Sequence, residues 1–312
     1  MLSVVTGAAG FIGSRLCGQL LSEGQSVVGI DCFTDYYPKS RKLSNLKPLL
    51  KQRRFRFLRV DLSKECPPSA FRGADYVFHL AAQPGVRDSW GQTFAPYVRN
   101  NVVATQKLLE VVKRTEPRRI IYASSSSIYG DAESLPTSED ALPRPVSPYG
   151  VTKLAAEHLF SSYAKAYGVP SIVLRYFTVY GPGQRPDMAF FRIIDKVSKR
   201  EQVTIYGSGE QSRDFTFIED TVRATKMAAK AKAGRVFNVG SGRIHSVNEA
   251  IALIESLLGT KAKVKHLSKA LGDVTKTSAD ISRIRKAVGY RPTVGFEDGL
   301  RKQVEWQTGR AL

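Results

Sequence analysis

Residues 6–14, TGAAGFIGS, follow the apolar run Leu2–Val5 and open an amphipathic segment, in the order strand, tight turn, helix. Glycines in such a turn let the backbone approach a pyrophosphate closely and let the helix pack against the strand. The free amides and the dipole at a helix N-terminus favour an anion. Gly7, Gly10 and Gly13 therefore predict a dinucleotide-binding turn, although a glycine triplet alone also occurs in ordinary turns.

A second predicted strand, Ser26–Ile30, ends at the acidic residue Asp31. In a dinucleotide-binding unit, a carboxylate at this position hydrogen-bonds the adenosine ribose hydroxyls and disfavours a 2′-phosphate. The next basic residue is Lys39, so no close cation favours that phosphate. We therefore predict NAD rather than NADP as the cofactor.

Strand and helix patterns alternate up to residue 176, which is typical of a doubly wound parallel sheet. The predicted strands are Leu2–Val5, Ser26–Ile30, Phe55–Val60, Tyr76–Leu80, Arg119–Ala123 and Ser171–Tyr176. After Gly181, short strands such as Val203–Tyr206 and Val236–Val239 mix with helices. The sequence predicts an α/β fold with a Rossmann domain over residues 1–180 and a smaller C-terminal α/β substrate lobe over residues 181–312.

The stretch SPYGVTK, residues 147–153, carries Tyr149 and Lys153 four positions apart. Four residues are slightly more than one helical turn, so both side chains project from one helix face. An ammonium beside a phenol lowers the tyrosine pKa, which makes Tyr149 a candidate proton acceptor. This spacing also occurs on ordinary surface helices. It gains weight here from the glycine turn and from the serine cluster YASSSSIYG at residues 122–130.

The chain of 312 residues has three cysteines and a formal net charge of +19. Cys17, Cys32 and Cys66 lack metal-ligand spacing, and their odd number argues against a disulfide framework. No apolar run approaches membrane-spanning length, and no secretory leader pattern is present. We therefore expect a cytoplasmic enzyme without a membrane partner.

Much of the positive charge lies in Lys39–Arg56, which holds eight basic residues and no acidic one. The leucines at 43, 46, 49 and 50 have helical spacing, which predicts a helix with one buried face and a solvated basic side. Aromatic residues for base stacking are not interleaved, so nucleic acid is a less favoured partner.

The four histidines are too far apart in sequence to predict a metal site. The sequence shows no Ser/His/Asp arrangement with a strand–turn–helix elbow, so it does not indicate a hydrolase.

Six motifs occur in order along the chain: TGAAGFIGS, HLAAQPG, YASSSSIYG, SPYGVTK, RYFTVYGPGQRPDM and RDFTFIED. Together they resemble the extended short-chain dehydrogenase/reductases, and among these the nucleotide-sugar epimerases. The stretch RYFTVYGPGQRPDMAFF is most similar to UDP-glucuronate 4-epimerases. The resemblance implies bound NAD, a UDP-sugar substrate, and interconversion of UDP-glucuronate and UDP-galacturonate through a transient C4 ketone.

The resemblance also implies residue roles. Tyr149 would be the base at the C4 hydroxyl, Lys153 would hold the nicotinamide ribose, and Ser125 would hydrogen-bond the C4 oxygen. The implied cofactor-binding residues are Gly7, Gly10, Phe11, Ile12, Gly13, Asp31, Asp61, Leu62, Leu80, Ala81, Ala82, Asn100, Tyr149, Lys153 and Tyr176. The substrate-binding candidates are Arg87, Ser125, Ser126, Ser127, Thr178, Arg185, Tyr206, Arg213 and Asp273.

The two ends of the substrate have separate candidates. Arg213 suits the diphosphate, because a guanidinium matches phosphate geometry. Asp273 matches the acidic ribose contact of the family pattern RPGD. Ala270 stands where that pattern has arginine, and we expect Lys269 to substitute for it.

Ser127 bears on the reaction type, because related dehydratases and decarboxylases typically carry an acidic residue at this place. A 4,6-dehydratase needs an acid to expel a hydroxyl, so Ser127 argues against dehydration. Decarboxylation stays open, because a C4 ketone makes the sugar a β-keto acid. We hypothesise that a cradle of hydroxyl groups holds the substrate carboxylate out of alignment with that ketone; its residues are Ser125, Ser126, Ser127 and Thr178. Arg87 or Arg185 would bind the anionic substrate as a further anchor. The alternative is a purely structural role, in which these small hydroxyl residues cap a strand end and the turn after it.

Two alternatives use the same scaffold: an epimerase of UDP-glucose and UDP-galactose, and a UDP-glucuronate decarboxylase. A non-catalytic NAD- or RNA-binding protein is more remote, because Ser125, Tyr149 and Lys153 are all present. The family resemblance further implies a homodimer formed through the predicted helices Pro96–Thr115 and Tyr149–Tyr167.

Overall fold

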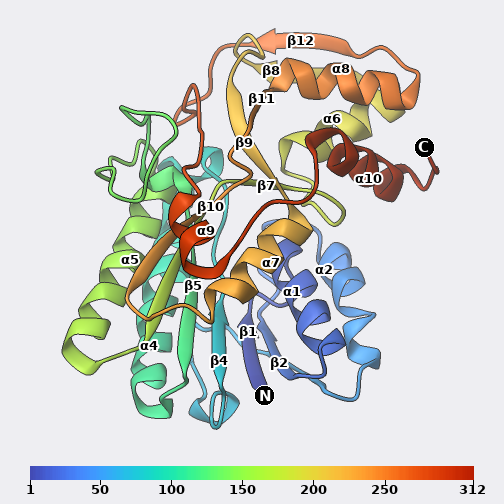
Figure 1. Ribbon diagram of the computed structural model, residues 1–312. Helices are drawn as coiled ribbons and strands as arrows, with labels where there is room; N and C mark the ends of the chain where they lie inside the picture. Colours follow the sequence, from blue (N-terminus) through green and yellow to red (C-terminus); the bar gives the residue numbers. More distant parts are fainter.

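Seven parallel strands form the central sheet of the computed structural model, which describes residues 1–312 (Figure 1). Their spatial order is β10-β6-β5-β4-β1-β2-β3, so the strand order reverses between β1 and β4. In open α/β sheets, ligands bind beyond the carboxyl ends of the strands at such a reversal. The strands are β1 Leu2–Thr6, β2 Ser26–Asp31, β3 Phe55–Arg59, β4 Tyr76–His79, β5 Arg119–Ser125, β6 Ser171–Tyr176 and β10 Arg235–Val239.

Helices cover both faces of this sheet, because successive strand residues point to opposite sides. Val4 packs in a cluster with Leu108 of α4 and Phe160 of α5. Val5 packs in another cluster with Leu16 of α1 and Val222 of α7. The helices are α1 Phe11–Ser22, α4 Ala104–Thr115, α5 Pro148–Tyr167 and α7 Ile218–Ala228. No helix combines the length and the apolar character needed to cross a bilayer.

A smaller lobe lies beyond the carboxyl ends of the strands (Figure 1). It holds the three-stranded sheet β11-β9-β7 and the parallel pair β12-β8. Its strands are β7 Thr178–Tyr180, β8 Gln202–Tyr206, β9 Ser212–Phe217, β11 Ile244–Ser246 and β12 Lys263–Leu267. Its helices are α6 Ala189–Ser198, α8 Val247–Leu258 and α10 Phe296–Thr308, and α9 Ser282–Val288 packs against β10 and α7.

The expectation that the strand Val236–Val239 belongs to the smaller lobe is wrong. This strand is β10, which pairs with β6 in the register Val236↔Val173 and forms one edge of the central sheet. Helix α7 likewise packs against α1 on the main sheet. The chain therefore leaves the large unit after β6 and returns to it, which a local strand and helix pattern does not reveal.

Two predicted helices are interrupted in the structure. The basic stretch forms α2, Lys39–Leu46, and a short 3₁₀ turn at Leu49–Lys51, because Pro48 has no amide hydrogen to continue the helical hydrogen bonds. Its predicted buried face is therefore partial: Leu46 and Leu49 are buried, whereas the leucines at 43 and 50 are exposed. The second, Pro96–Thr115, is divided into α3 at Phe94–Tyr97, a π-helical turn at Val98–Val103, and α4.

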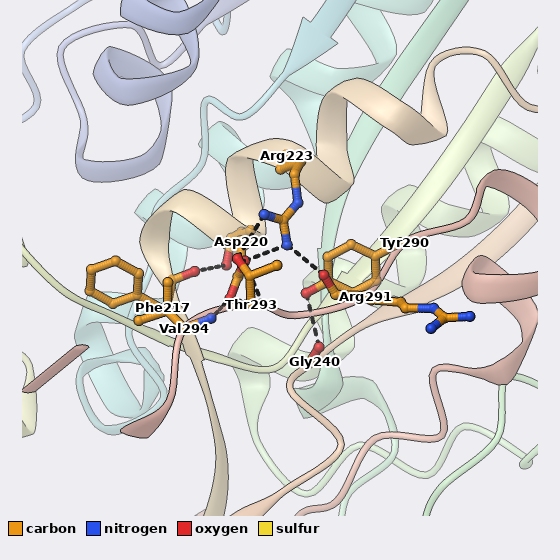
Figure 2. Close-up of polar contacts among 9 residues, drawn as sticks. Phe217, Asp220, Arg223, Gly240, Tyr290, Arg291, Thr293 and Val294 are labelled. Atoms are coloured by element: carbon orange, nitrogen blue, oxygen red, sulfur yellow. Dashed lines mark hydrogen bonds and ion pairs between the residues drawn. The ribbon is translucent and has the colours of Figure 1, made fainter. Parts of the chain in front are cut away.

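Asp220 of α7 connects the large unit to the smaller lobe (Figure 2). Its carboxylate is buried and accepts hydrogen bonds from the Thr293 and Val294 amides at 3.0–3.1 Å and from the Thr293 hydroxyl at 3.0 Å. Arg223 donates to Asp220 at 2.5 Å and to the Thr293 hydroxyl at 2.8 Å. This segment leads directly into α10, which packs against α6 and α8. The Asp220 contacts thus fix where the smaller lobe begins its last helix.

Candidate active site

The glycine turn lies where β1 meets α1, at the reversal of the strand order. Gly7 has φ +72°, and a Cβ there would lie 2.9 Å from the Ala81 amide nitrogen. A Cβ on Gly13 would lie 2.1 Å from the Gly7 carbonyl oxygen. Neither position has room for a side chain, so α1 begins directly against the strand. Its first amides face a cavity, which we call the first cavity.

Asp31 ends β2 at the rim of the first cavity. Its two carboxylate oxygens accept from the Ala9 amide at 3.1 Å and from the Phe33 amide at 2.8 Å. These bonds fix the carboxylate beside the glycine turn, and its role as a ribose ligand stays a prediction.

All the predicted cofactor-binding residues line the first cavity, although they come from the ends of five strands of the central sheet, from α1, from the π-helical turn and from α5. They are Gly7, Gly10, Phe11, Ile12, Gly13, Asp31, Asp61, Leu62, Leu80, Ala81, Ala82, Asn100, Tyr149, Lys153 and Tyr176. The structure therefore brings the whole predicted set to one place.

Among the further residues that line this cavity are four polar ones that were not predicted to do so: Tyr36, Tyr37, Lys42 and Arg185. Lys42 is buried, and its ammonium donates to the Thr34 carbonyl at 2.6 Å. Burial lowers the pKa of Lys42, and Asp31 opposes that shift. The signal in the sequence is the position of the tyrosine pair soon after the second strand. The basic run around Lys42 instead predicts a solvated helix face.

Tyr149 and Lys153 both lie in the first turns of α5 and line the first cavity. The Lys153 ammonium is buried and donates to the Ala123 carbonyl of β5 at 2.7 Å. Burial lowers the pKa of Lys153 to about 7, and Glu157 opposes the shift. Burial raises the pKa of Tyr149, whereas a hydrogen bond with Ser125 and the charge of Arg185 lower it. The groups that lower the pKa of Tyr149 are thus Ser125 and Arg185, and the effect of Lys153 on Tyr149 stays a prediction.

A buried ion pair that sequence reasoning missed supports this part of α5. Glu157, one turn after Lys153, binds Arg175 of β6 at 2.8 Å and accepts a hydrogen bond from Ser124 of β5. Arg175 also donates to the Tyr129 hydroxyl at 2.9 Å. A paired buried charge tolerates little displacement of its partner. These contacts hold α5 in a fixed position against β5 and β6.

The four residues of the predicted hydroxyl cradle are not part of the lining of either cavity. The Ser125 hydroxyl accepts from the Ser127 amide and contacts its hydroxyl, both at 3.1 Å, so it caps the turn after β5. Ser126 begins that turn, and Thr178 begins β7. None of the four residues lines the first or the second cavity. The capping geometry that explains such residues structurally is therefore present.

A second cavity lies between the segment at 85–88, α6 and β8, and it shares Tyr36 and Arg185 with the first. Of the predicted substrate-binding residues, Arg87, Arg185, Tyr206 and Asp273 line it. Arg87 pairs with Asp273 at 2.7 Å, and its guanidinium lies 4.2 Å from the Tyr206 ring centre. Arg192 and Lys196 of α6 also line it and were not predicted. The second cavity is thus lined by four cationic side chains.

Arg213 does not line the second cavity in this structure. Its guanidinium donates to the carbonyls of Ser212 at 2.9 Å and Val274 at 2.7 Å, beside the Arg87–Asp273 pair. It therefore holds the segment that carries Asp273. Lys269 is exposed, contacts the Thr275 hydroxyl at 3.4 Å, and does not line the cavity either.

The parallel sheet, the glycine turn at its reversal and the Tyr149–Lys153 helix together define a dinucleotide-binding α/β enzyme. Residues 3–240 match the NAD dependent epimerase/dehydratase family. The chain is 39% identical to UDP-glucuronate 4-epimerase of Thermodesulfobacterium geofontis, over 97% of this chain and 95% of that one. It is 43% identical to an uncharacterized UDP-glucose epimerase, YtcB, of Bacillus subtilis, over 98% of both chains.

A solved structure agrees over nearly the same length. The crystal structure of UDP-glucuronic acid 4-epimerase from Bacillus cereus, in complex with UDP-glucuronic acid and NAD, superposes with a TM-score of 0.97 at 44% identity and 99% coverage of both chains. This chain belongs to the NAD dependent epimerase/dehydratase family. The predicted family resemblance and the Rossmann fold are confirmed. The tight glycine turn and the Asp31 carboxylate fit the NAD of that family.

Proposed function

We propose that this protein is a UDP-glucuronate 4-epimerase, which interconverts UDP-glucuronate and UDP-galacturonate with bound NAD. The observation that carries the proposal is the junction of the two cavities. Tyr149 and Lys153 line the first cavity, and Arg185, which lines both, leads into a second cavity with three more cationic side chains. Such a lining suits a substrate with both a diphosphate and a sugar carboxylate.

In the proposed mechanism, Tyr149 takes the proton of the C4 hydroxyl as the ketone forms and returns it at the end of the cycle. NAD, when bound, accepts the C4 hydride and gives it back to the opposite face of the ketone, so no net oxidation occurs. Ser125 hydrogen-bonds the C4 oxygen, and Lys153 holds the nicotinamide ribose. Arg185 and Ser125 are the groups that favour the Tyr149 phenolate against its burial.

The substrate-binding roles follow the division between the cavities. We propose that Arg87, Tyr206 and Asp273 bind the uridine diphosphate end and that Arg213 acts through the segment it holds. The hydroxyl cradle of Ser125, Ser126, Ser127 and Thr178, with Arg185, faces the carboxylate only if the sugar lies close to Tyr149. Thr178→Ala then raises the fraction of UDP-pentose by-product, and an unchanged product ratio would remove the cradle from the proposal.

Incubation of the purified protein with UDP-glucuronate, without added cofactor, tests the main proposal by proton NMR. Accumulation of UDP-galacturonate supports both C4 epimerisation and retained NAD. UDP-xylose or a 4-keto-pentose as the main product would make the protein a decarboxylase. Turnover of UDP-glucose but not UDP-glucuronate would favour the second candidate, which the Bacillus subtilis relative suggests.

We further propose a cytoplasmic homodimer with two functional units. Residues 1–180, with β10 and α7, bind NAD, and the rest of residues 181–312 binds mainly the nucleotide sugar. Exposed apolar residues on the π-helical turn and α5, namely Val98, Val103 and Val151, support a dimer through these helices. Three free cysteines suit a reducing compartment. Sedimentation of the purified protein at the mass of a monomer would contradict the dimer.

A further inference from the structure

Tyr36 stands at the boundary between the two cavities. It lies in the connection between β2 and α2, and its side chain lines both the first and the second cavity. Arg185 also lines both cavities, and its guanidinium lies 5.9 Å from the Tyr36 ring centre. The position of this one aromatic ring therefore affects both cavities at once.

The Tyr36 hydroxyl faces two carboxylates on two different loops. It donates to Asp88 at 2.9 Å and lies 3.5 Å from Asp187. Burial, followed by the charge of Asp187 and the hydrogen bond to Asp88, raises the pKa of Tyr36. The phenol therefore keeps its proton and stays a donor at neutral pH.

Each carboxylate is linked to one of the two arginines, Arg185 and Arg87, that are candidates for binding the anionic substrate. Asp187 holds the Arg185 guanidinium with two bonds, at 2.9 and 3.0 Å. Asp88 follows Arg87 in the same short turn. The tyrosine hydroxyl thus connects the two segments that carry these arginines.

Gly85 shows how closely Tyr36 is seated. A Cβ at this position would lie 2.1 Å from the Tyr36 hydroxyl oxygen. The hydroxyl therefore occupies the space that any side chain at residue 85 would need. Its seat is built by two separate segments, at residues 85–88 and 187.

We propose that Tyr36 is a positioning residue that couples the two cavities. Its hydroxyl sets the distance between the Arg87 and Arg185 segments so that an acidic sugar nucleotide fits between them, and its ring closes the first cavity over the cofactor. This inference rests on the proposed function. It adds a residue that contacts neither the predicted catalytic groups nor the glycine turn by a hydrogen bond.

Tyr36→Phe tests the inference because it keeps the ring and removes only the hydroxyl. We expect KM for UDP-glucuronate to rise about tenfold, as for the loss of one hydrogen bond to a charged group, while kcat changes little. We also expect NAD to leave the protein faster, because the ring loses the hydrogen bond to Asp88 that holds it over the first cavity. The NAD retained after gel filtration over time measures this release. Tyr167→Phe, at the exposed far end of α5, is the matched control and keeps wild-type values.

A double-mutant cycle with Asp88→Ala identifies the route of the effect. If Tyr36 acts through Asp88, the double variant has a KM close to that of the more affected single variant. If the change in KM of the double variant instead equals the sum of the changes in the two single variants, on a free-energy scale, the coupling is overturned, because the hydroxyl then acts independently of Asp88.

Two results separate this inference from the proposed function. If the wild type converts UDP-glucuronate and Tyr36→Phe has unchanged KM and NAD retention, the inference is overturned and the function stands. A lower kcat together with a lower melting temperature, at an unchanged KM, would also overturn it, because a purely structural role has that effect. A wild type that does not convert UDP-glucuronate fails the proposed function, while the NAD-release comparison still tests the closure by Tyr36.

Discussion

The first cavity is lined from the ends of neighbouring parallel strands, whereas the second is lined from loops and from both parts of the molecule. Gly7, Asp31 and Leu80 follow or end β1, β2 and β4, whose spacing is set by the hydrogen bonds of the sheet. In the second cavity, Arg87 lies in a short 3₁₀ turn, Arg185 lies on a loop, and Tyr206 lies on β8 of the smaller lobe.

The two cavities therefore differ in what fixes the positions of their lining residues. In the first cavity, one continuous sheet holds the short motifs in place, and each motif determines the local backbone geometry around it. The second depends on how the smaller lobe docks, and this docking rests on contacts such as those of Asp220 (Figure 2). Substitutions in the first region should therefore affect the cofactor and the chemistry, and substitutions at the docking contacts should affect the substrate.

Tyr149→Phe has the largest expected effect, because it removes the proposed proton acceptor and leaves the ring that lines the first cavity. The rate of UDP-galacturonate formation should fall about a thousandfold. Retained NAD and the melting temperature should stay near those of the wild type. A loss below tenfold would show that another group takes the proton.

Gly13→Ala tests whether the first cavity depends on the close approach of α1 to β1. A Cβ there meets the Gly7 carbonyl at 2.1 Å, so the variant should lose about 1–3 kcal/mol of stability together with its NAD. Gly18→Ala on the same helix is the control, since its Cβ would lie 3.8 Å from Leu49. Calorimetry and the NAD absorbance of the purified variants check both. Equal NAD content in the two would contradict the close-packing argument.

Asp220→Asn tests the docking of the smaller lobe. The substitution weakens the bonds to Arg223 and to the Thr293 amide, which should cost about 2 kcal/mol of stability. KM for UDP-glucuronate should rise severalfold while NAD retention stays unchanged. The control is Asp298→Asn, an exposed carboxylate on α10 that pairs with Arg301. Loss of NAD with an unchanged KM would contradict the assignment, because the Asp220 contacts would then affect cofactor binding and not substrate binding.

His79 gives the smallest expected effect, in the acid stability of the large unit. Burial lowers its pKa from 6.5 to about 3, and its ring nitrogens contact the hydroxyls of Thr6 and Thr105. Below pH 6.5 the unfolded chain takes up a proton that the folded chain refuses, so stability is lost as the pH falls toward 3, by about 1.4 kcal/mol per pH unit.

His79→Gln should therefore be less stable at pH 7.5 but lose less stability between pH 6.5 and 5.5. Urea unfolding at these pH values measures the difference. An identical pH dependence in the variant and the wild type would mean that His79 titrates normally in the folded protein.

The sequence predicted the part of the first cavity that its local motifs form. A glycine turn, a strand-end carboxylate and a helical Tyr–Lys pair each determine a short-range geometry, and the parallel sheet brings them together. The family resemblance supplied further lining residues, such as Asp61 and Asn100.

The remainder was not readable from the sequence because it depends on tertiary contacts. The return of β10 to the main sheet, the pairing of Glu157 with Arg175, and the packing of Arg213 against backbone carbonyls all join segments far apart in the chain. Tyr36 is the same kind of case, since its partners Asp88 and Asp187 lie on separate loops.

The most direct test of the central claim is the fate of the hydrogen on C4. UDP-glucuronate labelled with deuterium at C4 is incubated in ordinary water, and the UDP-galacturonate is analysed by NMR and mass spectrometry. Transfer to bound NAD and back predicts that the product keeps the deuterium at C4. Replacement of the deuterium by solvent hydrogen would contradict the account, because C4 would then exchange a proton instead of a hydride.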